Sequence, residues 1–157
     1  MEERFLNQAI ASWDLQVANL RKLLSKLSDE ALQKEVAVGR NTGWYVLGHL
    51  VAVSDALSEM IGTGQRQYPD LQAVFIQHPD RSGLPLPSIS QLRSYVETIA
   101  ERLSGEFRTL NTAEWLNRHN AMTDDEFLSN PERNKLSVLL NRTNHLSYHI
   151  GQLRLLF

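Results

Sequence analysis

Apolar residues recur along the chain at the alternating three- and four-residue spacing of amphipathic helices. The first such stretch begins at Leu6 and ends near Leu27, which predicts a helix of about six turns. Ser28 is suited to cap a short helical turn directly after it. The second stretch, about 42–61, is apolar almost all round. Its helix is therefore expected to be buried on most faces.

Two further helices are predicted in the second half of the chain. Ser88, followed three residues later by Gln91, forms a capping box at the start of a stripe that continues to Leu110. Asn130 and Pro131 combine a capping residue with a proline at the first helical position. We therefore expect the last helix to begin there and to run to the C-terminus.

Two connections separate these helices. Residues 62–87 contain four of the five prolines and show little periodicity, so they predict a long crossover with one helical turn at 71–75. Long loops in compact domains are often functional, which makes this crossover a candidate lid over a site. Residues 111–130 are polar, apart from Trp115 and Phe127, which are expected to anchor the segment to the core.

Four amphipathic helices without any run of strand-like alternation predict an all-α four-helix bundle with a long crossover between helices 2 and 3. The chain has 157 residues, which suits one domain over residues 1–157 that buries about 68–70% of its unfolded surface. Metal and cofactor sites in such bundles are built from side chains on facing helices.

Composition narrows the possible functions. The formal net charge is −2, and Lys and Arg are scattered among acidic residues, so nucleic acid is not an expected partner. No stretch reaches the length of about 18 apolar residues that a membrane span needs, and the N-terminus does not resemble a signal peptide. A cytoplasmic protein without a membrane partner is expected. There is no cysteine, so any metal must be bound by histidine and carboxylate side chains.

Three of the five histidines are candidate metal ligands. His145 and His149 are four residues apart in the last helix, a spacing that allows two imidazoles to bind one metal but also occurs between unrelated surface neighbours. His49 lies in the most apolar run of the chain. It is either a core histidine bonded to a backbone carbonyl or a third ligand that faces the pair from a neighbouring helix. His78 and His119 are interpreted as solvated loop residues.

Other catalytic motifs are absent from the sequence. No histidine has glutamate three residues before it, which excludes the di-iron sites of ferritin-like bundles. The sequence also lacks His-Glu-x-x-His, a glycine-rich phosphate loop and Gly-x-Ser-x-Gly.

Two segments resemble the signatures of the DinB-like (DinB/YfiT) metalloprotein superfamily. They are Trp-x4-His at 44–49 and His-x3-His-x-Gly-Gln at 145–152. The resemblance covers essentially the whole chain. It implies an antiparallel bundle with up-down-down-up connections and one divalent metal, zinc or nickel, on His49, His145 and His149. It also implies a homodimer, for which the apolar C-terminal residues 155–157 are a candidate interface.

The resemblance leaves two functions open. Characterised relatives include S-transferases that use bacillithiol or mycothiol and a mycothiol-dependent maleylpyruvate isomerase. The first hypothesis is therefore a metal-dependent transferase or hydrolase that acts on a small electrophile, with a low-molecular-weight thiol as a possible cosubstrate. The alternative is a non-catalytic metal-binding stress-response or interaction module of the same fold.

Several residues are candidates to support such a site, although no catalytic base is identified. Trp44 and Tyr45 are placed to wall the pocket, and four polar residues near the histidine pair are candidate supporting or substrate-binding groups: Arg142, Asn144, Tyr148 and Gln152. Asp55, almost two turns beyond His49, is a weak candidate base. Gly151 is expected to allow close helix packing. A third possibility is an inert bundle whose histidines belong to the core.

Overall fold

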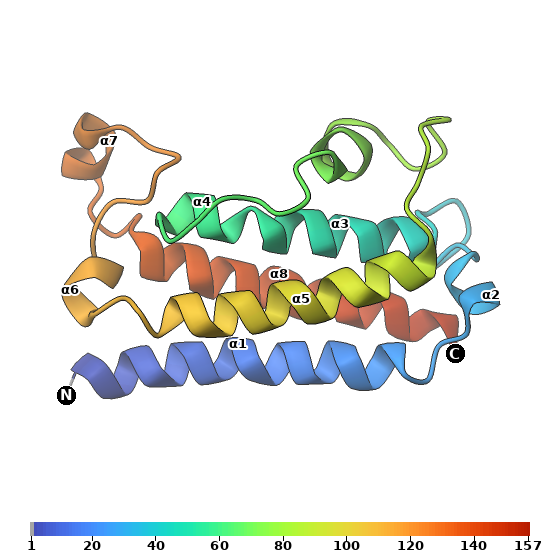
Figure 1. Cartoon of the computed structure of the whole chain (residues 1–157), viewed down its shortest axis with the longest axis horizontal. Helices are drawn as coiled ribbons and strands as arrows, with labels where there is room; N and C mark the ends of the chain where they lie inside the picture. Colours follow the sequence, from blue (N-terminus) through green and yellow to red (C-terminus); the bar gives the residue numbers. More distant parts are fainter. Residues whose placement is uncertain (1) are drawn as a thin grey trace.

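Four long helices form the body of the protein in a computed structural model that describes residues 2–157 (Figure 1). They are α1 (Glu2–Leu24), α3 (Gly43–Asp55), α5 (Ile89–Phe107) and α8 (Lys135–Leu153). Residues 2–157 contain no β-strand, only two isolated bridges. The predicted all-α class is therefore confirmed.

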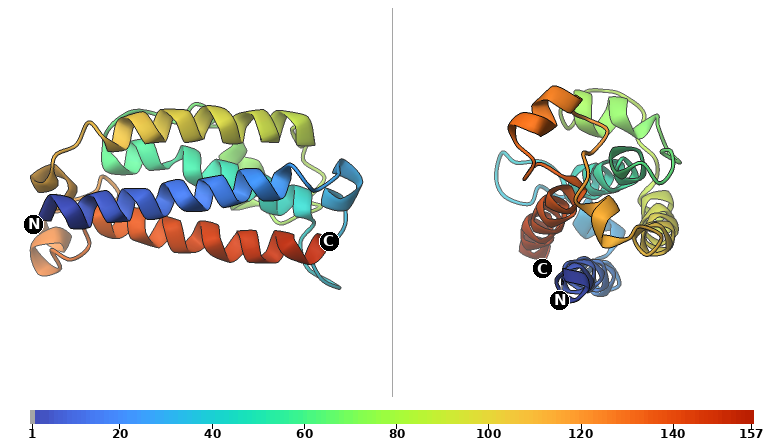
Figure 2. Two further views of the ribbon diagram at one scale, coloured as in Figure 1. Left: turned by 90° about the horizontal axis from the view of Figure 1, so that it is seen from below. Right: turned by 90° about the vertical axis from the view of Figure 1, so that its left-hand side faces the viewer.

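The four helices lie side by side around a common core (Figures 1 and 2). In Figure 1, α1 and α8 run from left to right, and α3 and α5 run in the opposite direction. The apolar stripe predicted for the first helix is buried, with Trp13 only 2% exposed. The buried apolar side chains of all four helices belong to one cluster. None of the helices in residues 2–157 is both long and apolar enough to cross a membrane.

The second predicted helix is interrupted once. It forms α3 and then α4 (Leu57–Ile61), with a break at Ala56. At the break, the Arg102 guanidinium donates a hydrogen bond to the backbone carbonyl of Asp55. A side chain that inserts into the hydrogen-bond ladder of a helix is a recognised cause of a kink. Gly62, in the left-handed conformation with φ of 76°, then ends α4.

The crossover from residue 62 to residue 88 packs along α3 and α4 (Figure 1). Its helical turn is the π-type η1 (Ala73–Gln77), two residues later than the predicted turn. Phe75 at its centre is fully buried. The indole Nε1 of Trp44 donates to the carbonyl of Pro87, and the amide of Thr42 donates to Asp80. The crossover is therefore fixed to α3 at both of these points.

The predicted caps of two helices are confirmed. Ser28 caps the short helix α2 (Asp29–Leu32), where its hydroxyl accepts a hydrogen bond from the Ala31 amide. Ser88 and Gln91 form the expected capping box at the start of α5. Each of these side chains accepts from an amide that has no partner within the helix.

The predicted start of the last helix at Asn130-Pro131 is wrong. Helix α8 begins at Lys135, and its N-cap is Asn134. Asn134 has extended backbone angles because it forms an antiparallel bridge with Arg118, and the Lys135 amide donates to the Asn117 carbonyl. This pairing prevents the segment before Asn134 from continuing the helix, so tertiary contacts outweigh the local Asn-Pro signal.

The polar segment before α8 contains two short helices that were not predicted. They are α6 (Thr112–Trp115) and α7 (Asp124–Ser129), and each begins with a capping box. Trp115 is fully buried, as expected of an anchor, whereas Phe127 is only partly buried. The chain ends in the 3₁₀ turn η2 (Arg154–Leu156).

Candidate metal centre

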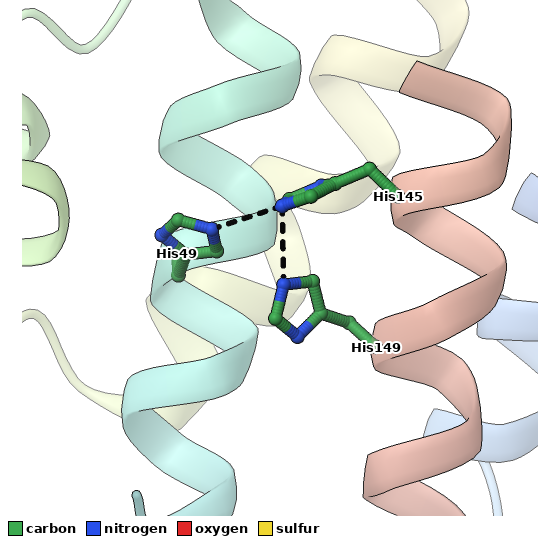
Figure 3. A group of neighbouring side chains, drawn as sticks. All are labelled: His49, His145 and His149. Carbon is green, nitrogen blue, oxygen red and sulfur yellow. Dashed lines mark hydrogen bonds between the residues drawn. The ribbon is translucent and has the colours of Figure 1, made fainter. Parts of the chain in front are cut away.

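Three histidines from two antiparallel helices meet at the middle of the bundle (Figure 3). His49 projects from α3, and His145 and His149 project from successive turns of α8. The Nε2 atom of His145 lies 3.2 Å from Nε2 of His49 and 3.1 Å from Nε2 of His149. All three rings are partly buried. The structure therefore brings together the three histidines that the sequence singled out.

These separations suit ligands of one divalent cation. Zn²⁺ binds histidine nitrogen at about 2.0–2.1 Å, so two imidazole ligands of a tetrahedral site lie about 3.3 Å apart. The separations of His145 Nε2 from the other two Nε2 atoms are close to that value, and one ligand atom from each of the three residues lies within 4.8 Å of the others. The donor set is neutral imidazole, which suits zinc, nickel and other transition metals.

The outer nitrogens of two rings are held by oxygen acceptors. His49 Nδ1 donates to the Phe75 carbonyl over 2.9 Å, and His149 Nδ1 donates to the Gln152 side-chain oxygen over 2.7 Å. A neutral imidazole that carries its proton on Nδ1 has a lone pair on Nε2. The unprotonated Nε2 atoms of His49 and His149 both face His145, which can donate at most one proton to one of them. A cation at the centre would satisfy all three nitrogens.

The protein environment also favours neutral rings. Burial, followed by the charges of His149, His49 and Arg142, lowers the pKa of His145 to about 4. Burial also lowers the pKa of His149, against the opposing effect of its hydrogen bond to Gln152. Since a metal ligand must be unprotonated, these shifts prepare both α8 histidines for binding at neutral pH.

Gly48 and the crossover position the His49 ring. The ring of Phe75 packs against Gly48 so closely that a Cβ atom at position 48 would lie 2.2 Å from it. This contact places the Phe75 carbonyl within reach of His49 Nδ1. The hydroxyl of Tyr45 donates to the carbonyl of His78 over 2.7 Å and lies 3.3 Å from the Phe75 carbonyl. The crossover is thus part of the site rather than a distant connection.

The sequence model of the DinB superfamily matches residues 12–153 of the chain. The chain belongs to the DinB superfamily. No curated protein matches it. In this DinB-superfamily chain, the two motifs that suggested the family supply the three clustered histidines, and the glycine of the first motif supplies the contact with Phe75.

The other candidates in the DinB-superfamily chain have mixed outcomes. Gln152 contacts His149 directly, and its amide donates to the Tyr148 hydroxyl, which fixes the orientation of the amide. Asn144 and Tyr148 are exposed. Trp44 and Tyr45 hydrogen-bond to the crossover. Gln152 is therefore the clearest supporting residue.

Asp55 is not placed as a catalytic base. Its fully buried carboxylate accepts hydrogen bonds from the amides of Gln67 and Tyr68 and from the Arg102 guanidinium. These three donors give it a structural role, in which it fixes the start of the crossover and joins α3 to α5. Sequence spacing alone could not show that its partners are backbone amides.

Two expectations about single residues are wrong. His119 is not a solvated loop residue: it is 6% exposed, and its Nδ1 accepts a hydrogen bond from the Ala121 amide. Gly151 does not allow close helix packing, because a Cβ atom there would meet no atom within 4 Å. His78, by contrast, is exposed as expected.

The Phe75 carbonyl is a functional group that sequence reasoning missed. It belongs to the backbone of a π-type turn, so no residue type marks it. The glycine before His49 is the only signal in that motif that another segment approaches the helix closely there.

Proposed function

We propose that this protein is a metal-dependent transferase or hydrolase acting on a small electrophile, with zinc or nickel bound by His49, His145 and His149. The observation that carries the proposal is the convergence of three Nε2 atoms, with the rings of His49 and His149 held from outside by Phe75 and Gln152. Within residues 2–157, no fourth histidine or carboxylate joins the group. Three protein ligands leave coordination positions open to small molecules, as in catalytic sites.

A divalent cation bound there would supply Lewis acidity, lowering the pKa of a bound water to about 7 or holding a small thiol as its thiolate. The residues of the chain orient the ligand nitrogens. The Phe75 carbonyl and the Gln152 amide oxygen hold protons on the outer nitrogens of His49 and His149, and so keep Nε2 of both rings available. Since the sequence has no cysteine, any thiol must be a small cosubstrate, such as bacillithiol or mycothiol.

The proposal extends to assembly and location: a cytoplasmic homodimer of single-domain chains. Leu155 and Phe157 support a dimer, because these apolar residues after α8 are 65% and 70% exposed. Sedimentation of the wild type at micromolar concentration should give the mass of a dimer. The double variant Leu155→Ser/Phe157→Ser should give a monomer, whereas Leu128→Ser, at an equally exposed apolar position, should remain a dimer. A monomeric wild type would reject the dimer.

The proposed transferase activity is tested by measuring the reaction of a panel of thiols with the electrophile 1-chloro-2,4-dinitrobenzene. In this reaction the thiolate sulfur bonds to the ring carbon, the carbon–chlorine bond breaks, chloride leaves, and the thiol proton passes to buffer. Zinc- or nickel-loaded protein should accelerate the reaction, His145→Ala should lose the acceleration, and His78→Ala should keep it. A parallel ester panel with water as nucleophile tests hydrolysis.

The alternative function predicts a different pattern. A non-catalytic metal-binding module would gain thermal stability from zinc or nickel, yet show no turnover above the His145→Ala background in either panel. That combination would overturn the catalytic proposal.

A further inference from the structure

A pocket separate from the three-histidine cluster is lined by residues of α4, of the segment before α8 and of the first half of α8. Figure 1 shows α4 and the start of α8 at the same end of the bundle. The volume of the pocket is about 300 Å³, which is at the lower end of the range for small-molecule sites. Its apolar lining comes from Met60 and Val138, and its polar lining residues are His119, Arg133, Ser137, Asn141 and Arg142. No carboxylate side chain lines it.

Arg142 is a partly buried cation whose guanidinium is poorly satisfied by the described residues. Its buried Nε has no hydrogen-bond partner, and its closest polar contact is the Met60 sulfur, a weak acceptor, 3.8 Å from Nη2. Arg21 and Arg102 also have an unpartnered buried Nε, but each forms an ion pair with a carboxylate. Arg142 forms none among residues 2–157. An unmatched buried guanidinium is costly unless a ligand supplies the acceptor.

The remaining polar lining adds donors and positive charge. Arg133 forms no ion pair within the described chain. The nearby Glu126 accepts hydrogen bonds from Thr123, and these, more than the charge of Arg133, lower the pKa of Glu126. His119 accepts the Ala121 amide on Nδ1, so the neutral ring carries its proton on Nε2, as a further donor. The N-terminal turn of α8, which is the positive end of that helix's dipole, lies at the same end of the bundle as the pocket.

The pocket and the histidine cluster share one flank of α8. Arg142, His145 and His149 follow one another at the three- and four-residue spacing of a single helix face. Arg142 precedes His145 by three residues, about 4.5 Å along the helix axis. On the opposite side, Met60 in α4 lines the pocket and His49 in α3 belongs to the cluster. The two sites are therefore neighbouring positions along α8.

We propose that this pocket binds the anionic group, carboxylate or phosphate, of the small molecule whose reactive end reaches the three histidines. The inference rests on the proposed function, because it names the substrate class of that site. Arg142 and Arg133 bind the anion, and planar guanidinium groups suit both oxyanions. The substrate is thus a small anionic electrophile or thiol rather than a neutral or cationic one.

The first experiment is calorimetric titration of inorganic phosphate into the wild type and four variants. Arg142→Gln should weaken phosphate binding by about tenfold or more, and Arg133→Gln should weaken it several-fold. Arg4→Gln, which removes one charge from an exposed position on α1, is the matched control and should change it less than about twofold. His145→Ala should retain phosphate binding, since His145 does not line the pocket.

These variants separate binding in the pocket from binding to the metal. Phosphate affinity that is lost in His145→Ala but kept in Arg142→Gln would overturn the inference, as would a wild type that does not bind phosphate at millimolar concentration. Phosphate binding by a chain that retains no metal would support the pocket and contradict the proposed function.

The second experiment tests the connection between the two sites. A series of ω-mercapto carboxylates is titrated into cobalt-loaded protein, with the corresponding ω-mercapto alcohols as uncharged controls, and the thiolate–cobalt absorption band is followed. At one chain length the carboxylate should bind about tenfold more tightly than the alcohol, and Arg142→Gln should abolish the difference. Equal affinities at every length would contradict the inference even if the metal is bound as proposed.

Discussion

The ring of Phe75 lies against the backbone of Gly48, and the carbonyl of the same phenylalanine accepts a hydrogen bond from His49, the next residue after the glycine. One contact therefore sets both the packing of the crossover on α3 and the orientation of a candidate ligand. The absence of a side chain at position 48 has a direct chemical consequence at the histidine cluster.

Gly48→Ala should damage both the fold and the site. The added Cβ would lie 2.2 Å from the Phe75 ring, so the ring and η1 must move, at a cost of about 1–3 kcal/mol in the free energy of unfolding. The displaced carbonyl should also release His49 and weaken metal binding. Urea unfolding of the metal-free variant and a competition titration with a chromogenic chelator measure the two effects separately.

Gly151→Ala is the matched substitution in the second motif, and it should change the free energy of unfolding in the opposite direction. A Cβ there meets no atom within 4 Å, and alanine favours helix over glycine by about 0.5–1 kcal/mol. The variant should be more stable, with unchanged metal affinity. A destabilised Gly151→Ala, or a Gly48→Ala as stable as wild type, would contradict the packing described for the two motifs.

The helices and the His145/His149 pair could be predicted from the sequence because both depend on local spacing, whereas His49 was joined to the pair through the resemblance to the DinB-like superfamily. Buried stripes follow the helical period, and His145 and His149 share a face wherever the helix lies. The start of α8 was mispredicted because the bridge between Arg118 and Asn134, a contact between segments, fixes the backbone there. His119 was misassigned for a similar reason: residue type does not reveal that a loop is folded against the bundle.

Gln152 should control metal affinity more than stability. Its side-chain oxygen holds the proton of His149 on Nδ1, so Gln152→Ala frees the ring to rotate and should weaken metal binding by about 10–100-fold. Gln152→Glu keeps an acceptor at the same place and should preserve tight binding. A competition titration of both variants is the measurement. If alanine and glutamate have the same affinity, the hydrogen bond does not position His149.

Asp55→Ala should destabilise the fold without affecting the metal. The variant leaves Arg102 without its closest carboxylate in a mostly buried position and removes the acceptor for two amides, at a cost of about 3–5 kcal/mol. Asp14→Ala, which breaks an ion pair with Arg108 on the surface, is the control and should cost less than about 1 kcal/mol. Thermal unfolding measures the stability of both variants, and elemental analysis measures their metal content. Loss of activity in a folded, metal-loaded Asp55→Asn variant would instead give Asp55 a catalytic role.

The metal-free protein should lose stability as the pH falls below about 6.5. The pKa of His145 is about 4 in the folded chain and near 6.5 when unfolded, so between these values the unfolded state binds more protons. This group contributes its full stabilisation above pH 6.5 and loses it as the pH falls to about 4, a change on the order of 3 kcal/mol. Denaturant unfolding from pH 7 to pH 4 measures the slope.

His145→Gln removes this titration and should flatten the pH dependence, whereas His78→Gln, at an exposed position, should leave it unchanged. Comparison with the variants is needed because carboxylates also titrate near pH 4. Parallel stability curves for wild type and His145→Gln would contradict the assigned burial of His145.

Metal stoichiometry, measured by elemental analysis after loading with zinc or nickel and extensive dialysis, tests directly whether the three histidines bind a metal ion. A metal site on the three histidines predicts about one ion per wild-type chain and per His78→Ala chain, and far less than one for His49→Ala, His145→Ala and His149→Ala. A wild type that retains no stoichiometric metal, or triad variants that retain as much as wild type, would contradict it.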